Sequence, residues 1–318
     1  MSDDAASGAV AVELRGLARS FGDVAAVEGL DFQVRPGELF GLVGPDGAGK
    51  TTTLRMLAGV LRPTSGDAVI LGRSVAEDPE AVKPDLAYMS QRFGLYGDLT
   101  VRENLDFYAD LYEVSPEEKA ARLERLYRFS GLEPFQDRLA GDLSGGMKQK
   151  LGLSCALIHQ PRLLLLDEPT FGVDPISRRD LWLIVHEMVA EGVTVIVSTA
   201  YMDEAERFDR LVLLQEGRVV ALDTPEALRG ELRGRVVAVR GSAPPRTLRD
   251  ASLELSVVVR AAVFGDRIHA TVQRAERDAP ALADALGKRG FEDVEVEEVE
   301  PSMEDVYLER TADAREAA

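Results

Sequence analysis

The amino-acid sequence predicts an α/β protein, in which a mostly parallel sheet is covered by helices and is followed by a small α+β domain. Residues 39–57 read as a strand, a glycine-rich loop and a helix. Apolar runs at 163–166 and 193–199 alternate with helical patterns, as the buried strands of parallel sheets do. Because the composition changes near residue 231 and the chain has 318 residues, we expect one domain at 1–230 and a second at 231–318.

Composition limits the classes of partner. The chain is 45% hydrophobic and 29% charged, as is typical of globular proteins, and its formal net charge is −18. This acidity argues against a nucleic-acid partner, because phosphate backbones bind clusters of Lys and Arg. Residues 1–8 do not resemble a signal peptide, and no apolar run reaches the length of a membrane span. Any membrane role is therefore expected to come through a partner.

The glycine-rich loop predicts a phosphate site. It consists of Gly44, Pro45, Asp46, Gly47, Ala48 and Gly49, followed by Lys50, Thr51 and Thr52. The glycines let backbone N–H groups turn towards an anion, and the following helix adds its positive dipole end. The Lys50 ammonium can reach the β- and γ-phosphates, and the Thr51 hydroxyl can ligate the bridging Mg²⁺.

The segment before this loop predicts a β-rich lobe. Short strand patterns occupy residues 10–14 and 30–34, and Pro36-Gly37 forms a turn. Phe21 lies between them in a turn. Its ring can stack on a nucleotide base or anchor the loop in the core, and position alone leaves both interpretations open.

Polar residues follow two later strands. The strand at 86–91 ends in Gln91, which can point into the nucleotide site, and the strand at 163–166 ends in Asp167 and Glu168. The carboxyl ends of parallel strands are where ligands bind. We expect the Asp167 carboxylate to bind Mg²⁺ and Glu168 to orient or deprotonate water.

Helical patterns between these strands predict a helical insert at about 92–155. Within it, Ser144, Gly145 and Gly146 open a helix. The start of this helix is either a second anion site or a glycine-rich helix end without a ligand, and the stretch alone leaves both open.

The second domain is expected to contain a hairpin at 256–273 and a helix at 279–289. A strand at 291–299 and a final helix from about 301 complete the pattern. The acidic stretch 292–300 alternates Val with Glu, which favours a solvated strand face over a metal site.

Taken together, the motifs at 44–51, 91, 143–149, 163–168 and 172–174 resemble the nucleotide-binding subunit of an ATP-binding cassette (ABC) transporter. The resemblance extends from residue 10 to about 230. It implies a P-loop NTPase core that binds ATP with Mg²⁺. It also implies that two cassettes pair head to tail, as a homodimer or with a second cassette. Ser144, Gly145 and Gly146 of one chain would then contact the γ-phosphate bound at Lys50 of the other.

The resemblance also implies roles for single residues. Phe21 corresponds to the ring that stacks on adenine, Gln91 to the residue that senses Mg²⁺ and attacking water, and Asp174 to the aspartate that communicates across the dimer. Residues 91–104 would form a groove that grips a cytoplasmic helix of an integral-membrane permease subunit. That places the chain at the cytoplasmic face of the inner or plasma membrane. The C-terminal domain is similar to that of exporter ATPases for drugs, antibiotics or polysaccharides.

The sequence departs from the family pattern at Ala200, where a histidine is expected. That histidine would hydrogen-bond the γ-phosphate. Losing such a bond costs about 1.5–3 kcal/mol, or roughly ten- to a hundred-fold in rate. An engineered change and a natural degenerate site both fit Ala200, and the intact neighbours favour the former.

We therefore expect an exporter ATPase that binds ATP through Lys50, with Glu168 and Gln91 in catalysis, and hydrolyses it slowly. Two alternatives are a non-transport ABC ATPase and a non-hydrolysing ATP-dependent switch. Soluble ABC proteins that act on ribosomes or DNA usually carry two cassettes or a long coiled coil, and the sequence has neither.

Overall fold

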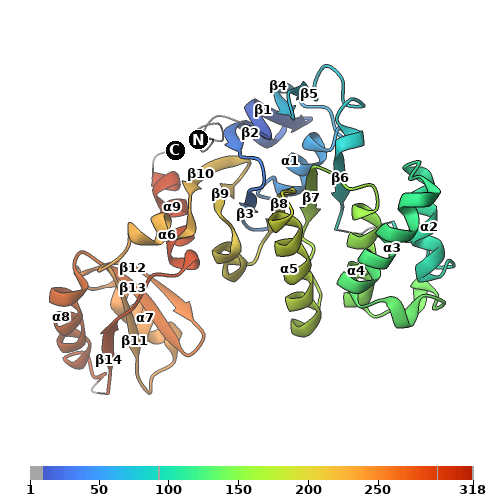
Figure 1. Ribbon diagram of the computed structural model, residues 1–318. Helices are drawn as coiled ribbons and strands as arrows, with labels where there is room; N and C mark the ends of the chain where they lie inside the picture. The colour runs from blue at the N-terminus through green and yellow to red at the C-terminus, as the bar shows by residue number, and fades with distance from the viewer. Residues whose placement is uncertain (1–9, 92–93, 292, 317–318) are drawn as a thin grey trace, which may run out of the picture. The chain divides into compact units, whose positions relative to one another are not determined.

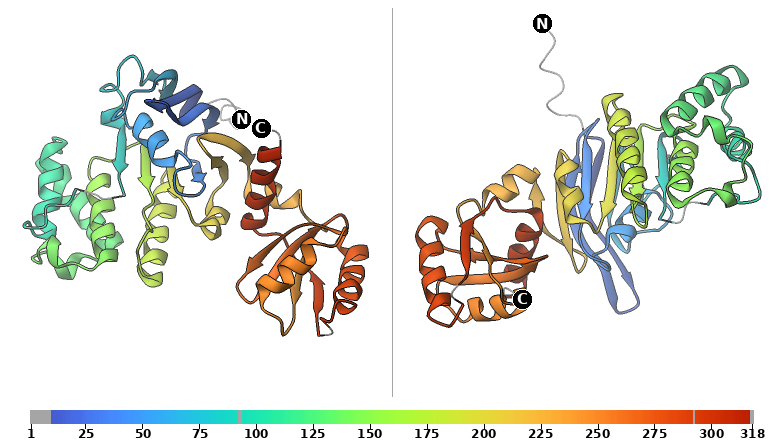
Figure 2. Two further views of the ribbon diagram at one scale, coloured as in Figure 1. Left: turned by 180° about the vertical axis from the view of Figure 1, so that it is seen from behind. Right: turned by 90° about the horizontal axis from the view of Figure 1, so that it is seen from below.

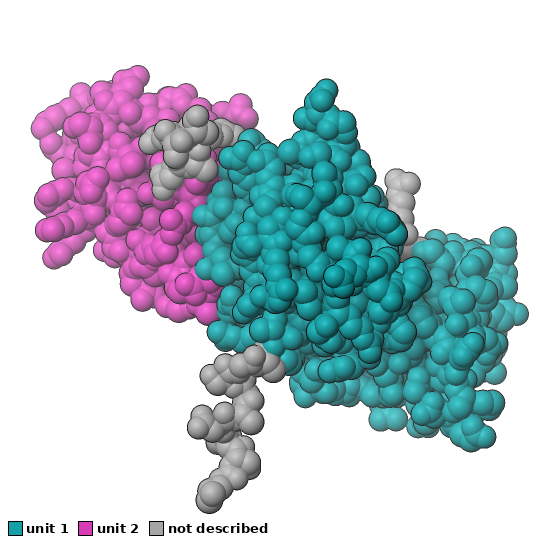
Figure 3. All heavy atoms as spheres, turned by 90° about the horizontal axis from the view of Figure 1, so that it is seen from above, with its two compact units in different colours: residues 1–222 teal, residues 223–318 magenta. Residues whose placement is uncertain are grey.

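The computed structural model describes residues 10–91, 94–291 and 293–316 (Figure 1). The chain forms two compact units, and Figure 3 colours them separately. The first unit ends at Leu222 and the second begins at Asp223. Helix α6 (Pro225–Gly230) packs against helix α9 (Met303–Glu316), and both belong to the unit that begins at Asp223.

The first unit contains a six-stranded sheet in the order β10-β9-β3-β8-β7-β6. Strands β9, β3, β8, β7 and β6 run parallel, as predicted. Every residue of β3, β7 and β8 is buried, which explains their continuous apolar sequences. The strands span Leu39–Val43 (β3), Leu86–Met89 (β6), Leu163–Asp167 (β7), Thr194–Thr199 (β8), Arg210–Gln215 (β9) and Arg218–Asp223 (β10).

A four-stranded sheet in the order β2-β1-β4-β5 forms the predicted β-rich lobe. Its strands pair antiparallel, and the two long ones contain β-bulges that let the chain bend and continue beyond the short patterns seen in the sequence. The strands span Val12–Phe21 (β1), Val24–Val34 (β2), Ser65–Ile70 (β4) and Arg73–Ser74 (β5).

One hydrophobic core joins the two sheets. Helix α1 (Lys50–Leu57) contributes Leu54 and Leu57 to it, and β3 contributes Phe40 and Leu42. The ring of Phe40 stacks on Phe32 of the lobe with centroids 5.3 Å apart. The loop before α1 is therefore anchored by packing on both of its sides.

The helical insert lies beyond the β6 edge of the six-stranded sheet, as Figures 1 and 2 show. Its helices begin where the sequence has good capping residues. Thr100 forms a capping box with Glu103, and Ser115 precedes Pro116 at the first helical position. The elements are α2 (Val101–Leu111), α3 (Pro116–Ser130), η2 (Glu133–Phe135), η3 (Ala140–Asp142) and α4 (Gly145–Leu157). Arg92 and Phe93 of the predicted groove lie outside the described residues.

Three further helical segments lie in the described part of the first unit. They are the 3₁₀ segment η1 (Lys83–Asp85), helix α5 (Pro175–Ala190) and the 3₁₀ segment η4 (Met202–Arg207). Helix α5 packs against β8, so the predicted alternation of strand and helix is confirmed.

The second unit is an α+β domain with the connectivity β-α-β-β-α-β and the sheet order β12-β13-β11-β14. Its strand pairs are antiparallel, and this arrangement is the ferredoxin-like split βαβ motif. The elements are β11 (Val236–Arg240), α7 (Pro245–Leu253), β12 (Val258–Phe264), β13 (Arg267–Val272), α8 (Ala275–Gly287) and β14 (Glu295–Glu298).

The acidic stretch forms β14, which is shorter than the predicted strand. Glu295, Glu297 and Glu298 are exposed, as expected of a solvated face. Within the described ranges, no group of His, Cys, Asp and Glu side chains could hold a metal ion. Nor does the described part of the chain contain a helix with the length and hydropathy needed to cross a bilayer.

We expect Leu282→Ala in α8 to destabilise the second unit by about 2–5 kcal/mol, because its fully buried side chain fills the core between helix and sheet. Urea denaturation followed by circular dichroism would measure the loss. Leu253→Ala is the matched control, since Leu253 is 48% exposed. Equal losses in the two variants would contradict this description of the core.

Candidate functional site

A cavity of about 420 Å³ opens at the glycine-rich loop. Its lining combines the loop and first turn of α1 with residues that follow β6 and β7. The lining residues are Ala26, Asp46, Gly47, Ala48, Gly49, Lys50, Thr51, Thr52, Gln91, Glu168 and Phe171. Sequence reasoning identified all of these except Ala26 and Phe171.

The loop needs glycine at the start of α1. Gly49 caps this helix with a φ of 97°, a left-handed conformation that L side chains rarely adopt. A Cβ atom at Gly49 would lie 2.6 Å from the carbonyl oxygen of Ala26 in the β-rich lobe. The lobe therefore approaches the loop closely enough to contribute Ala26 to the cavity.

Lys50 is buried and its ammonium is held from several sides. Its Nζ donates to the carbonyl oxygens of Gly44 (2.7 Å) and Pro45 (3.0 Å), and it lies 3.1 Å from Glu168 Oε1. Gly44 and Pro45 thus contribute carbonyl groups behind the cavity rather than its surface. The ammonium is positioned between the loop and the carboxylate that follows β7.

Asp167 is the buried centre of a polar network. Its Oδ1 accepts hydrogen bonds from the hydroxyls of Thr51 (2.9 Å) and Ser198 (2.8 Å), and its Oδ2 accepts from Tyr88 (3.2 Å). These bonds compensate for the desolvation of a carboxylate that is 1% exposed. The hydroxyl of Thr51 and the carboxylate of Asp167 are hard oxygen donors of the kind that Mg²⁺ prefers.

The Tyr88 hydroxyl remains a donor over the physiological range. Burial, together with the nearby negative charge of Asp167, raises the pKa of Tyr88 to about 12. Neither Tyr88 nor Ser198 was identified from the sequence, because each follows from strand pairing and not from a motif.

Glu168 has a constrained backbone and a defined side-chain partner. Its φ is 49°, and its N–H donates to both the carbonyl oxygen (3.2 Å) and the hydroxyl (3.0 Å) of Ser198. The side-chain amide of Gln91 donates to Glu168 Oε2 over 3.2 Å. Gln91, Glu168 and Lys50 therefore form one contact group on the cavity wall.

The structure places the two exposed aromatic side chains Phe171 and Phe21 differently with respect to this cavity. Phe171, in the loop after Glu168, lines the cavity and is 56% exposed. Phe21 ends β1 and is 48% exposed, with the Arg19 guanidinium 4.7 Å from its ring centroid. Phe21 is not a core residue, and it is not among the described residues that line the cavity.

The second glycine cluster begins α4 beside the start of α5. Ser144 caps α4 by accepting from the Met147 N–H, and Asp174 caps α5 by accepting from Ile176 and Ser177. A Cβ at Gly146 would lie 2.2 Å from Ser177 Oγ and 3.3 Å from Asp174 Oδ2. None of these cluster residues is among the described residues that line the loop cavity.

The hydrogen bonds at the start of α5 favour the ionised form of Asp174. Hydrogen bonds from Ser177, chiefly from its backbone N–H, lower the pKa of this carboxyl. It is therefore ionised at neutral pH, at the positive end of the α5 dipole.

Ala200 directly follows β8, one residue beyond Thr199, whose carbonyl oxygen accepts from the N–H of Gly44 (3.2 Å). The position is thus next to the loop that precedes Lys50. Its methyl group provides no hydrogen bond there.

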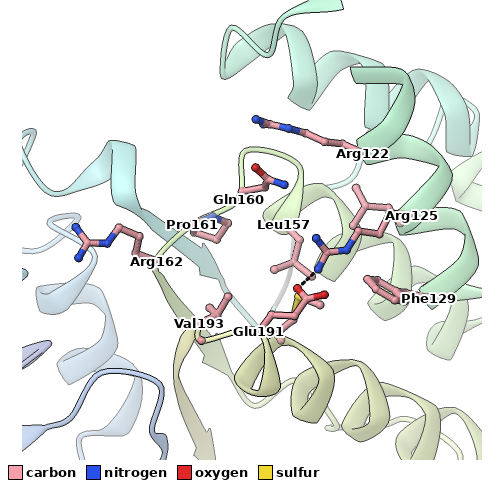
Figure 4. Close-up of a pocket in the computed structure, with 12 residues that line it drawn as sticks. Arg122, Arg125, Phe129, Leu157, Gln160, Pro161, Arg162, Glu191 and Val193 are labelled. Atoms are coloured by element: carbon pink, nitrogen blue, oxygen red, sulfur yellow. Dashed lines mark ion pairs between the residues drawn. The ribbon is translucent and has the colours of Figure 1, made fainter. Parts of the chain in front are cut away.

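Another cavity, of about 290 Å³, lies at the amino ends of β7 and β8, opposite the edge that carries Asp167 (Figure 4). Two of its three arginines have side-chain partners. Arg122 donates to the carbonyl oxygen of Ile158 and pairs with Glu118, and Arg125 pairs with Glu191. This cavity shares no lining residue with the loop site.

Comparison with known families matches residues 27–171 to the ABC transporter model. A probable multidrug ABC transporter ATP-binding protein, YbhF, of Escherichia coli is 43% identical over 302 residues. The alignment covers 94% of this chain and 51% of that protein. The chain therefore spans about half the length of this relative.

Two other matches cover nearly all of the compared protein. A Nod factor export ATP-binding protein I from a Rhizobium species is 38% identical over 95% of this chain and 97% of its own length. A solved structure described as the ATP binding subunit of an ABC transporter is 34% identical with a TM-score of 0.64. It covers 69% of this chain and 92% of the compared chain.

We expect Gly146→Ala to destabilise the first unit by about 1–3 kcal/mol, because the added methyl group must displace Ser177 at the start of α5. Gly145→Ala is the matched control, since the nearest atom to its Cβ lies 4.0 Å away. Thermal unfolding of both variants measures the difference. An unchanged melting temperature in Gly146→Ala would show that the two helix starts are not in contact.

Proposed function

Because the chain belongs to the ABC transporter ATP-binding family, we propose that it is the ATP-binding and ATP-hydrolysing subunit of an exporter. The observation that carries the proposal is the contact group of Lys50, Glu168 and Gln91, next to the paired Thr51 and Asp167. The names of the relatives, which refer to multidrug transport and Nod factor export, support an export function.

Each residue of the loop site has a proposed role. The backbone N–H groups of residues 46–52 bind the phosphates, and the Lys50 ammonium neutralises charge on the β- and γ-phosphates. Thr51, Asp167 and Gln91 would hold Mg²⁺, which offsets the charge of the phosphates. Glu168 orients and deprotonates the attacking water, and Gln91 helps to hold that water. Phe21 provides a ring for the adenine base, which its exposure supports.

The site is proposed to be completed by a second cassette. Ser144, Gly145 and Gly146 would contact the γ-phosphate held at Lys50 of the partner, and Asp174 would lie across the interface. Two facts support this: Ser144, Gly145 and Asp174 are exposed, and they lie outside the loop cavity of their own chain. ATP binding would close the dimer, and release of the products would open it.

The closing and opening of the dimer is proposed to be transmitted to permease subunits in the membrane. The segment 94–104 near Gln91 is a candidate groove for a cytoplasmic helix of such a subunit. This places the chain at the cytoplasmic face of the membrane, as a peripheral subunit. We propose domain limits at Leu222 and Asp223, with the ferredoxin-like unit as an accessory domain.

Dimer closure can be tested by static light scattering with and without Mg-ATP. We expect an ATP-dependent dimer for this chain and loss of ATP binding in Lys50→Ala. Gly145→Arg should bind a fluorescent ATP analogue normally and remain monomeric, because a Cβ at this position lies no nearer than 4.0 Å to its own chain, whereas the arginine would clash with the partner's nucleotide. A Gly145→Arg chain that still dimerises with ATP would contradict head-to-tail pairing.

We expect Ala200→His to raise kcat roughly ten- to a hundred-fold, since one hydrogen bond to a charged group in the transition state is worth about 1.5–3 kcal/mol. Steady-state phosphate release measures the change. Ala200→Leu controls for side-chain size, because it adds bulk without a donor. A rate for Ala200→His no higher than that of the present chain would show that hydrolysis is not impaired at this position.

Ala200 also favours a second candidate function, a non-hydrolysing ATP-dependent switch. For a switch, turnover in the presence of the membrane partner would stay at the background level. A stimulated rate would support the exporter ATPase.

A further inference from the structure

A buried carboxylate outside the loop cavity lies close to Ala200. Glu204 belongs to the 3₁₀ segment η4, four positions after Ala200, and is fully buried. Its Oε2 accepts from the hydroxyl of Thr199 over 2.6 Å. Its Oε1 accepts from Arg178 Nε (2.8 Å) and Trp182 Nε1 (3.2 Å), both in α5.

The burial of this charge makes its partners interdependent. A carboxylate removed from water is costly unless it is paired and hydrogen-bonded, and the loss of one partner leaves that cost uncompensated. Glu204 satisfies this requirement only if the end of β8 and helix α5 are both in place. The carboxylate therefore holds two elements at a set spacing.

The contact with Thr199 extends to the turn at residue 200. The Thr199 hydroxyl donates to Glu204 and also accepts from the N–H of Tyr201 over 3.0 Å. The Arg178 guanidinium lies 4.8 Å from the ring centroid of Tyr201. Both neighbours of Ala200 are thus tied to the Glu204 and Arg178 pair.

On its other side the same strand end reaches the carboxylates of the loop site. Ser198 donates to Asp167 and accepts from the Glu168 N–H. Asp174 caps helix α5 one turn before Arg178. Glu204 consequently connects the turn at residue 200 with the helix that Asp174 caps.

We propose that Glu204 is a positioning residue, which aims the side chain of residue 200 at the nucleotide and couples this turn to the Asp174 end of α5. The inference rests on the ATPase proposed above. Glu204 acts through Thr199 and Arg178 and touches no group of the loop cavity.

A spin label tests the positioning without any reference to turnover. Cys155, the only cysteine in the sequence, is fully buried, and burial raises the pKa of its thiol, so a nitroxide reagent would label Ala200→Cys selectively. We expect an immobilised component in the electron paramagnetic resonance spectrum, and its loss when Glu204→Gln is added. An unchanged spectrum would overturn the proposal.

Glu38→Gln is the matched control for this measurement. Glu38 is also a buried, bonded carboxylate, which pairs with Arg210 (3.2 Å) and accepts from the Arg35 N–H (2.7 Å), but it lies at the amino end of β3. Its replacement should leave the spectrum unchanged. If Glu204→Gln does not fold, Thr199→Val removes the same contact and should also mobilise the label.

Kinetics supply a second readout. We expect Glu204→Gln to abolish most of the ten-fold or larger gain from Ala200→His in kcat, with KM unchanged, whereas Glu38→Gln should preserve the gain. A gain that survives Glu204→Gln would overturn the proposal even if the melting temperature falls. If Ala200→His brings no gain in either background, the proposed impairment fails, and the spin-label result alone decides the role of Glu204.

Discussion

The parallel pairing of β3, β8 and β7 is the constraint on which the site depends. In this register Val43 lies opposite Thr199, and Asp167 lies opposite Ser198. All three strands therefore end at one edge of the sheet. The phosphate loop, the Asp167-Glu168 pair and the turn at Ala200 leave that edge within hydrogen-bonding distance of one another.

Strand β8 is the common support of two polar networks. Successive side chains of a strand point to opposite faces, so Ser198 reaches Asp167 while Thr199 reaches Glu204. Both networks are buried, and both are satisfied by donors from several elements. A displacement of the strand end would break bonds in both networks. The positions of Glu168 and Glu204 are therefore linked through one strand end.

The ferredoxin-like unit has a hydrophobic core of its own. Its core forms between one face of the antiparallel sheet and helices α7 and α8, with Leu248, Leu282 and Leu286 at its centre. The acidic strand β14 lies at one edge of the sheet, where exposed carboxylates oppose pairing with another strand. The acidic residues of this strand thus form a solvated edge of the sheet, in line with the alternation of Val and Glu in the sequence.

Local sequence by itself determined the elements and much of the loop site. Four leucines before Asp167, glycines around Lys50 and the capping residues Ser115 and Ser144 each express a short-range rule of backbone conformation or burial. The predicted positions of Lys50, Thr51, Gln91 and Glu168 followed from such rules, and the structure brings these four residues to one cavity.

Only the tertiary structure decided the partners of these residues. The hydrogen-bond partners of Tyr88, Ser198 and Glu204 could not be read from their local sequence, because these contacts come from strand register and from helices distant in the sequence. Helix α6 belongs to the second compact unit for the same reason, because it is held by contacts with α9. Local patterns depend on neighbours along the chain, whereas the pairing of buried polar groups depends on which strands and helices meet in space.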